Sequence, residues 1–309
     1  MWSGLESVGV ILIIIAIGFF FTYKHVWPER TADGLSAIVV KLSAPCLAVT
    51  SITARFDREL LASSLLLLLL AALHLLAMFL IGKGAARALR LSGGRRAVFE
   101  VSFTFSNVIF IGLPINQIVF GEEGVPFLFA YYILSLATFW GFGAAKIAAA
   151  GSDPERAAPS LRKVFNPGFL GVLLGAGLVQ AGLSLPPVLD TGLGYLAALT
   201  VPLSLLVIGA NLTVFAGGVP RVAADEVMVM AGKFVISPLV MLALMRLLGV
   251  TGLPFRVFLL SSTMPCHMQT SIIAQHHGVE GAYASKLVGL STLLSFITIP
   301  LAVALIHAI

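Results

Sequence analysis

Long apolar stretches alternate with short polar connections along the whole chain. A helix needs about 20 residues to cross a hydrocarbon core of about 30 Å, and stretches of this length recur throughout. A hydropathy window predicts ten spans, at residues 5–23, 35–53, 60–82, 97–121, 124–146, 166–185, 190–215, 224–248, 254–276 and 281–307. The pattern therefore predicts an all-α protein that crosses a membrane ten times.

The composition also indicates a protein that lies in a membrane. Apolar residues make up 59% of the chain and charged residues 11%, and the mean hydropathy is +1.03. These values leave too few polar side chains to coat a water-soluble surface. The first apolar run has no basic residue before it, which favours a spanning helix over a secretory signal. Cys46 and Cys266 each follow a proline within an apolar stretch, and this setting disfavours a disulfide framework or a thiolate metal cluster.

The charged residues predict the orientation. Lys and Arg number twelve in the connections on one side of the predicted spans and four on the other. By the positive-inside rule the richer side is cytoplasmic, which places both termini outside. We therefore expect a multi-pass membrane protein. The net charge of +5 is explained by orientation and gives no reason to expect nucleic acid as a partner.

A polar linker divides the chain into two halves. It lies at residues 151–165, begins GSDPERAAPSLRK, and separates residues 1–150 from residues 166–309. Five spans in each half give the halves opposite orientations, so any internal similarity must be an inverted repeat. Such similarity is faint but present: KLSAPCLAV around Pro45 aligns with ALTVPLSLLV around Pro202, 157 positions later.

Helix-breaking and polar residues gather in the predicted spans 4 and 9. The stretch SNVIFIGLPINQIVFG (residues 106–121) and the stretch PCHMQTS (residues 265–271) lie in corresponding spans. An unpaired backbone group in hydrocarbon costs several kcal/mol, so an interrupted helix survives only where protein or a wet cavity satisfies it. Paired interruptions point to a transport site, and helix ends carrying about half a positive charge favour an anion.

Three stretches resemble a known family. The sequences FSNVIFIGLPINQIVFGEEG, VPLSLLVIGANL and LVGLSTLLSFITIP are similar to helices of the auxin efflux carrier family, whose relatives include the plant PIN proteins and the bile acid sodium symporters. The resemblance implies two inverted repeats, with spans 1, 2, 6 and 7 as a scaffold and spans 3–5 and 8–10 as a mobile transport domain. It also implies an elevator-like motion, a homodimer, and an organic anion bound where spans 4 and 9 cross.

Carried over to this chain, the crossing falls at Ser106 and Asn107 in span 4 and at Pro265 and Cys266 in span 9. The plant relatives have a proline where Ser106 stands, so the Gly112–Pro114 region is a second candidate for the interruption of span 4. The candidate substrate-binding residues are Ser106, Asn107, Gly112, Pro114, Pro265, Cys266, His267 and Gln269. His267 is either a core histidine bonded to a carbonyl or a group that binds a carboxylate or a proton.

Several charged residues lie inside the predicted spans, and the sequence predicts different roles for them. Lys41 and Lys233 are candidate vestibule charges that draw an anion inward. Lys286 lies near a predicted cytoplasmic end and is expected to extend its amine to the headgroups. Glu100 follows Arg96 by four residues, a spacing that predicts an ion pair at the start of a helix.

Two spans differ in their apolar residues. Span 3 contains LLASSLLLLLLAALHLLAMFLIG and is typical of a lipid-facing helix, whereas span 6 contains GFLGVLLGAGL. Its small residues recur at near-helical spacing and predict close contact with another helix.

The sequence thus predicts a secondary carrier of a small organic anion, a mono- or dicarboxylate of the malate or malonate kind. No nucleotide-binding segment, metal-ligand spacing or cofactor motif is found, and coupling to Na⁺, to H⁺ or to neither is compatible with the residues. A membrane ligand sensor is an alternative. An intramembrane enzyme with Cys266 as nucleophile and His267 as base is disfavoured, because adjacent helical residues point about 100° apart.

Overall fold

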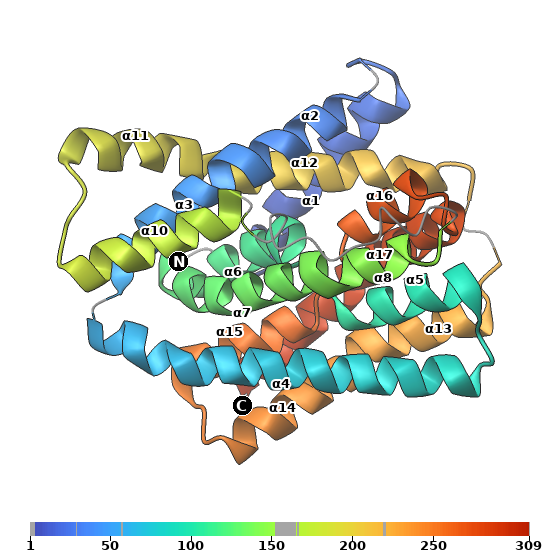
Figure 1. Cartoon of the computed structure of the whole chain (residues 1–309). Helices are drawn as coiled ribbons and strands as arrows, with labels where there is room; N and C mark the ends of the chain where they lie inside the picture. Colours follow the sequence, from blue (N-terminus) through green and yellow to red (C-terminus); the bar gives the residue numbers. More distant parts are fainter. Residues whose placement is uncertain are drawn as a thin grey trace. The chain divides into compact units, whose positions relative to one another are not determined.

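The computed structural model describes residues 4–28, 30–56, 58–151, 165, 167–218 and 221–308. These residues form helices, turns and irregular segments, and no strand occurs among them apart from one isolated bridge (Figure 1). The predicted all-α class is therefore confirmed over the described part of the chain. The predicted linker lies outside the described residues except for its two end positions, 151 and 165.

Six helices in the described part of the chain are long and apolar enough to cross a membrane. They are Thr31–Arg55, Leu65–Ala88, Glu122–Ala148, Pro187–Leu212, Ala224–Leu247 and Gly281–Ile306. Each coincides with a predicted span. Shorter apolar helices occupy predicted spans 1 and 6, and predicted spans 4 and 9 each consist of two short helices. The full count of ten spans remains a prediction.

The chain divides into two compact units. Unit 1 comprises Met1–Leu65, Ile109–Ile133 and Phe165–Gly218, and unit 2 comprises Leu66–Val108, Leu134–Val164 and Val219–Ile309. Three helices run from one unit into the other: α4 (Arg58–Ala88), η2 (Val108–Gly112) and α7 (Val125–Thr138). The predicted spans 4 and 5 are thus divided between the units.

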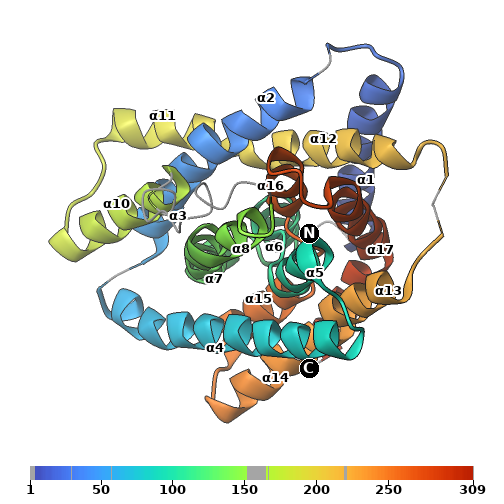
Figure 2. The ribbon, with the colours of Figure 1, turned by 45° about the vertical axis from the view of Figure 1, so that its right-hand side comes forward.

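Unit 1 is built from helix pairs that approach closely. Its helices are α1 (Gly4–Tyr23), α2 (Thr31–Ile38), η1 (Val39–Ser43), α3 (Ala44–Arg55), α6 (Leu113–Phe120), η3 (Glu122–Gly124), α10 (Pro167–Ala181), α11 (Pro187–Ala198), α12 (Thr200–Leu212) and η6 (Thr213–Phe215). Figures 1 and 2 show α10 alongside α3.

Glycines allow these close approaches. A Cβ added at Gly209 of α12 would overlap the backbone carbonyl of Ile15 in α1, and one added at Gly171 of α10 would overlap the backbone of Pro45 in α3. Helices in membranes associate through such small residues because apolar burial gives them little preference for each other over lipid. The close contact predicted for span 6 is therefore confirmed.

Unit 2 is arranged around α5. Its helices are α5 (Gly93–Thr104), η4 (Phe139–Gly143), α8 (Ala144–Ala148), α13 (Ala224–Ala231), η7 (Gly232–Ile236), α14 (Ser237–Leu247), α15 (Gly252–Ser262), α16 (Gln269–His276) and α17 (Gly281–Ala308). Every residue of α5 from Ala97 to Thr104 is buried, and the helix contacts α8, α13, α16 and α17 (Figure 2). Unit 2 also contains most of α4.

One face of α4 is apolar and exposed. Leu69, Leu76 and Leu80 are 50%, 53% and 55% exposed, whereas Leu70 and Met78 are fully buried. An exposed stripe of leucines on a long helix fits contact with lipid. The leucine-rich span therefore has the surface expected of a lipid-facing helix.

Three of the π-helical turns, η1, η2 and η7, are each followed by an α-helix with a proline at its second position. The prolines are Pro45, Pro114 and Pro238. Proline has no N–H to donate, and its ring crowds the carbonyl four residues earlier. A wider π turn relieves this crowding without ending the helix. These prolines therefore widen a turn locally, and the helical conformation continues through them.

Candidate functional site

Two non-helical segments meet in unit 2. Helix α5 ends at Thr104 and η2 begins at Val108, while α15 ends at Ser262 and α16 begins at Gln269. Residues 105–107 pair antiparallel with residues 265–267, and we call these two segments the crossing. The bridge joins Ser106 with Cys266. The N–H of Asn107 donates to the Pro265 carbonyl at 2.8 Å, and the N–H of His267 donates to the Phe105 carbonyl at 3.2 Å.

The crossing is buried, and protein groups satisfy its backbone. Ser106, Asn107 and Cys266 are 1%, 3% and 0% exposed. The N–H of Cys266 donates to the hydroxyl of Ser291 in α17 at 3.0 Å. Because water has little access, these bonds replace the helical hydrogen bonds that the chain loses at both interruptions.

The interruption in the first half lies at residues 105–107. Around Gly112 and Pro114 the backbone passes from η2 directly into α6 and remains helical. The side-chain amide of Asn116 donates to the Gly112 carbonyl at 2.7 Å, which provides a hydrogen bond within this segment. Gly112 and Pro114 belong to unit 1 and lie outside the crossing. The other predicted substrate-binding residues lie at the crossing or next to it in unit 2. These are Ser106, Asn107, Pro265, Cys266 and His267, with Gln269 at the first position of α16.

Lys233 lies at the crossing. Its side chain extends from η7, is 0% exposed, and donates from Nζ to Ser106 Oγ at 3.1 Å. Lys41, the other lysine predicted to line a vestibule, is exposed in η1. The sequence predicted Lys233 as a vestibule charge, but nothing in its spacing identified Ser106 as the partner.

The ring of His267 stacks on Phe139 of η4, with ring centroids 4.3 Å apart and an interplanar angle of 26°. Its Nδ1 atom is buried and has no hydrogen-bond partner within the described residues. No hydrogen bond in this part of the chain joins the Cys266 thiol to the His267 ring, as a nucleophile and its base require. The described residues also contain no group of three or more His, Cys, Asp or Glu side chains placed to hold a metal ion.

His74 has a structural setting that the sequence did not reveal. Its Nε2 atom lies 3.2 Å from both the carbonyl oxygen and the hydroxyl of Ser237 in α14. The Ser237 hydroxyl donates in turn to the Ser262 carbonyl at the end of α15, at 2.7 Å. These contacts join α4, α14 and α15 through buried polar groups.

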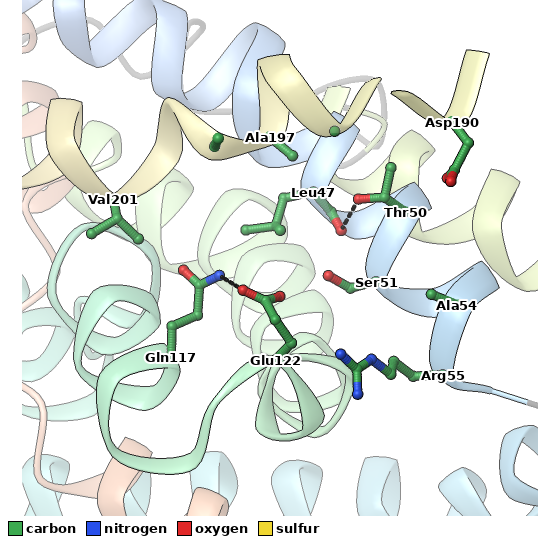
Figure 3. A pocket seen from close by; sticks show the side chains of 12 residues that line it. Leu47, Thr50, Ser51, Ala54, Arg55, Gln117, Glu122, Asp190, Ala197 and Val201 are labelled. Carbon is green, nitrogen blue, oxygen red and sulfur yellow. Dashed lines mark hydrogen bonds between the residues drawn. The ribbon is translucent and has the colours of Figure 1, made fainter. Parts of the chain in front are cut away.

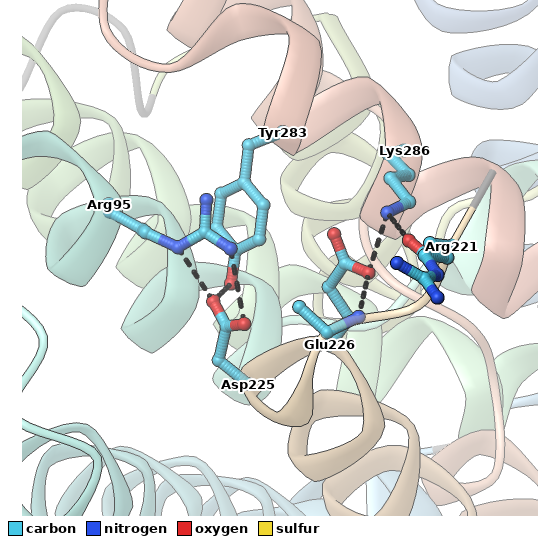
Figure 4. Close-up of polar contacts among 7 residues, drawn as sticks. Arg95, Arg221, Asp225, Glu226, Tyr283 and Lys286 are labelled. Atoms are coloured by element: carbon cyan, nitrogen blue, oxygen red, sulfur yellow. Dashed lines mark hydrogen bonds and ion pairs between the residues drawn. The ribbon is translucent and has the colours of Figure 1, made fainter.

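An ion-pair cluster joins three helices of unit 2 (Figure 4). Arg95 of α5 donates two hydrogen bonds to the Asp225 carboxylate of α13, at 2.8 and 3.1 Å. The Tyr283 hydroxyl of α17 donates to the same carboxylate at 2.7 Å. The guanidinium of Arg95 also lies 4.0 Å from the centre of the Tyr283 ring, a cation–π distance. The cluster thus fixes α5, α13 and α17, the helices that lead to Ser106, Lys233 and Ser291.

Two further ion pairs lie in the same unit. Lys286 binds the Glu226 carboxylate at 2.7 Å, so its amine is paired within the protein, in contrast to the predicted extension to the headgroups. Glu100 binds Arg96 at 2.7 Å, as its spacing predicted, and also binds Lys146 at 2.8 Å. The carboxylates of Glu100 and Glu226, both buried, therefore each have a cationic partner.

Unit 1 contains a separate polar cavity of about 490 Å³ (Figure 3). The side chains of Arg55, Glu122 and Asp190 point into it, and Gln117 donates to Glu122 at 2.7 Å. None of the predicted site residues lines this cavity. Two carboxylates and one guanidinium give the lining a net negative charge, so the cavity matches an anion less well than the surroundings of Lys233 do.

Comparison with known proteins gives the family. The model of the Mem_trans family, described as membrane transport protein, matches residues 3–303. An uncharacterized transporter of Methanothermobacter thermautotrophicus is 27% identical over 299 residues, which cover 96% of this chain and 96% of the relative. An uncharacterized transporter of Methanocaldococcus jannaschii is 23% identical over 319 residues, which cover 96% of this chain and 97% of the relative.

These matches span nearly the whole chain and point away from an enzyme. They agree with the apolar helices of the structure and with the motifs that resemble the auxin efflux carriers. The chain therefore belongs to the Mem_trans family of membrane transport proteins, the auxin efflux carrier family, and is a multi-pass membrane transporter.

Proposed function

We propose that this transporter is a secondary carrier of a small organic anion, a mono- or dicarboxylate of malate, malonate or auxin-like chemistry. Substrate binds at the crossing in unit 2. Access alternates between the two sides of the membrane by an elevator-type movement.

The observation that carries this proposal is the crossing itself. Two interrupted helices place polar backbone and side chains together at residues 105–107 and 265–267, in the buried interior of unit 2. Irregular backbone at membrane depth is tolerated only where protein or a water-filled cavity satisfies it, and such positions form substrate sites in secondary transporters.

The antiparallel pairing supports the proposed inverted repeats, residues 1–150 and 166–309. If the halves are related by a two-fold axis in the membrane plane, equivalent segments run in opposite directions where they meet. The segments around Ser106 and Cys266 pair in this way. Both positions are among those at which the family resemblance implies the crossing of spans 4 and 9.

The side chains at the crossing suit an anion. Ser106, Asn107, His267 and Gln269 supply hydrogen-bond donors, and no carboxylate belongs to the described segments of the crossing. The first turn of α16 follows immediately, and the N-terminus of a helix carries a partial positive charge. A carboxylate oxygen is the natural acceptor for such a set of donors.

We assign the roles of the spans from the family resemblance. Spans 1, 2, 6 and 7 form the scaffold and the homodimer interface, and spans 3–5 and 8–10 form the transport domain. The protein lies in a bacterial inner membrane, in contact with its lipids and with both termini outside. Its driving force is a gradient of the substrate, of Na⁺ or of H⁺, with no bound cofactor.

Counterflow in proteoliposomes tests the proposal. Vesicles loaded with unlabelled malate, malonate or acetate are diluted into the same labelled compound, and uptake is compared with vesicles that lack the protein. We expect saturable exchange of at least one carboxylate, and imposed Na⁺ and proton gradients then identify the coupling ion. Saturable binding without exchange would identify a sensor instead, and chemical conversion of the label would identify an enzyme.

Substitution of Asn107 tests the place of binding. Asn107→Ala removes a donor at the crossing and is expected to weaken carboxylate binding by about tenfold, which corresponds to one lost hydrogen bond to a charged group. Asn107→Asp adds a negative charge and should weaken binding further. The apparent melting temperature of each variant checks that it is folded. Unchanged affinity in both folded variants would remove Asn107 from the site.

A further inference from the structure

Lys233 differs from the other buried charged residues of unit 2. Among the described residues, Glu100 pairs with Arg96 and Lys146, Asp225 pairs with Arg95, and Glu226 pairs with Lys286.

No carboxylate in the described part of the chain lies within ion-pair distance of the Lys233 ammonium, and its hydrogen-bond partner there is the neutral hydroxyl of Ser106. The buried charges of the described unit therefore leave one cation without a counter-charge.

An ammonium in this position is unfavourable without a partner. Lys233 is 0% exposed, and removing a charge from water costs several kcal/mol unless an opposite charge or strong hydrogen bonds compensate. Ionisable groups inside membrane spans are therefore rare and mark sites of substrate or ion movement. A π-helical turn carries Lys233, and such turns are frequent at functional positions.

We propose that the Lys233 ammonium is the fixed positive charge of the substrate site and that the site selects organic anions with a single negative charge. This inference rests on the proposed carrier function and narrows its substrate class from mono- or dicarboxylates to monocarboxylates. An ammonium has three donors, and Ser106 accepts one of them. The two remaining donors match the two oxygens of one carboxylate.

The selectivity follows from the charge balance. One carboxylate neutralises Lys233, and the loaded site then carries no net charge. A second carboxylate on the same substrate finds no other cation at the described residues of the crossing, so it must be buried unpaired or remain outside the site. Either outcome lowers the affinity for a dianion.

The test compares two probes that differ by one charge, malonate and monomethyl malonate. Each is supplied with a ¹⁴C label, and counterflow and binding are measured with the full-length protein in proteoliposomes. For the wild type we expect monomethyl malonate to bind at least tenfold more tightly than malonate. Equal or tighter binding of malonate would overturn the selectivity for a single charge.

Lys233→Met keeps the length of the side chain and removes its charge. We expect it to weaken the binding of monomethyl malonate by at least tenfold and to abolish the preference between the two probes. The matched control is Lys83→Met, because Lys83 lies in α4, outside the two segments of the crossing, and is partly exposed. The control should behave as wild type. Unchanged binding in folded Lys233→Met would overturn the role of Lys233.

Two further comparisons keep the test decisive. If Lys233→Met does not fold, Lys233→Arg retains the charge and should keep the preference for monomethyl malonate, whereas loss of that preference in a folded Arg variant would count against the charge. If no carboxylate exchanges through the wild type, the carrier function itself fails. If carboxylates exchange without a preference between the probes, only the inference about charge fails.

Discussion

Asp225→Asn is predicted to destabilise the protein by removing the centre of the ion-pair cluster. The Asp225 side chain is 8% exposed and receives two hydrogen bonds from Arg95 and one from Tyr283. Asparagine keeps the shape but removes the charge, and its amide presents donors to a guanidinium that has no acceptor.

The magnitude follows from the burial of the two partners. Hydrogen bonds to charged groups contribute about 1.5–3 kcal/mol each. Arg95 is 37% exposed, so water can partly replace the two hydrogen bonds that Arg95 makes to the Asp225 carboxylate. Because Tyr283 can still donate to the asparagine oxygen, we expect a total loss of about 2 kcal/mol, or about 4 °C in melting temperature for a chain of this size.

Asp33→Asn is the matched control. Asp33 pairs with Arg30 at 3.5 Å, but the two side chains are 73% and 87% exposed. Such surface pairs contribute roughly 0–1 kcal/mol, so this variant should melt within about 2 °C of the wild type. Both variants are compared by thermal unfolding of the purified protein in the same detergent. Equal melting temperatures for the two variants would refute the reasoning, because they would show that the buried cluster stabilises the fold no more than an exposed pair.

Two further predictions concern packing and the crossing. Gly209→Leu should lower the melting temperature by several degrees, because a side chain there overlaps the α1 backbone, whereas Gly177→Leu has open space and should have little effect. Ser291→Ala should lower the free energy of unfolding by about 1–3 kcal/mol, because the buried N–H of Cys266 loses its acceptor. Ser102→Ala removes a buried hydroxyl that has no hydrogen-bond partner in the described structure, so it should leave the free energy of unfolding nearly unchanged. Thermal unfolding measures both pairs, and similar losses within either pair would contradict the corresponding argument.

The sequence predicted the helices well because apolar runs of membrane length leave few alternatives. Six predicted spans coincide with single long helices in the described part of the chain, and the small residues of span 6 do pack closely. The end of α15 was also predictable from the sequence, because Pro265 restricts the backbone of the residue before it and has no N–H to donate. The pair of Arg96 with Glu100 followed from helical spacing alone.

The sequence did not predict the contacts between distant segments. No proline marks the end of α5, and residues 105–107 are held instead by hydrogen bonds to residues 265–267 and to Lys233. The partner of Lys233 lies 127 positions away, and that of Lys286 lies 60 positions away in Glu226. Local pattern does not encode such pairs, because they depend on how the helices pack in three dimensions.

The most direct test of the account is the distance between bound substrate and Lys233. Monomethyl malonate labelled with ¹³C at its free carboxylate is bound to protein whose lysines carry ¹⁵N at Nζ, and solid-state NMR measures the dipolar coupling between carbon and nitrogen. The account predicts a strong coupling in the wild type that disappears in Lys233→Met and persists in Lys83→Met. Bound ligand with no such coupling in the wild type would contradict the claim that a carboxylate binds at the crossing.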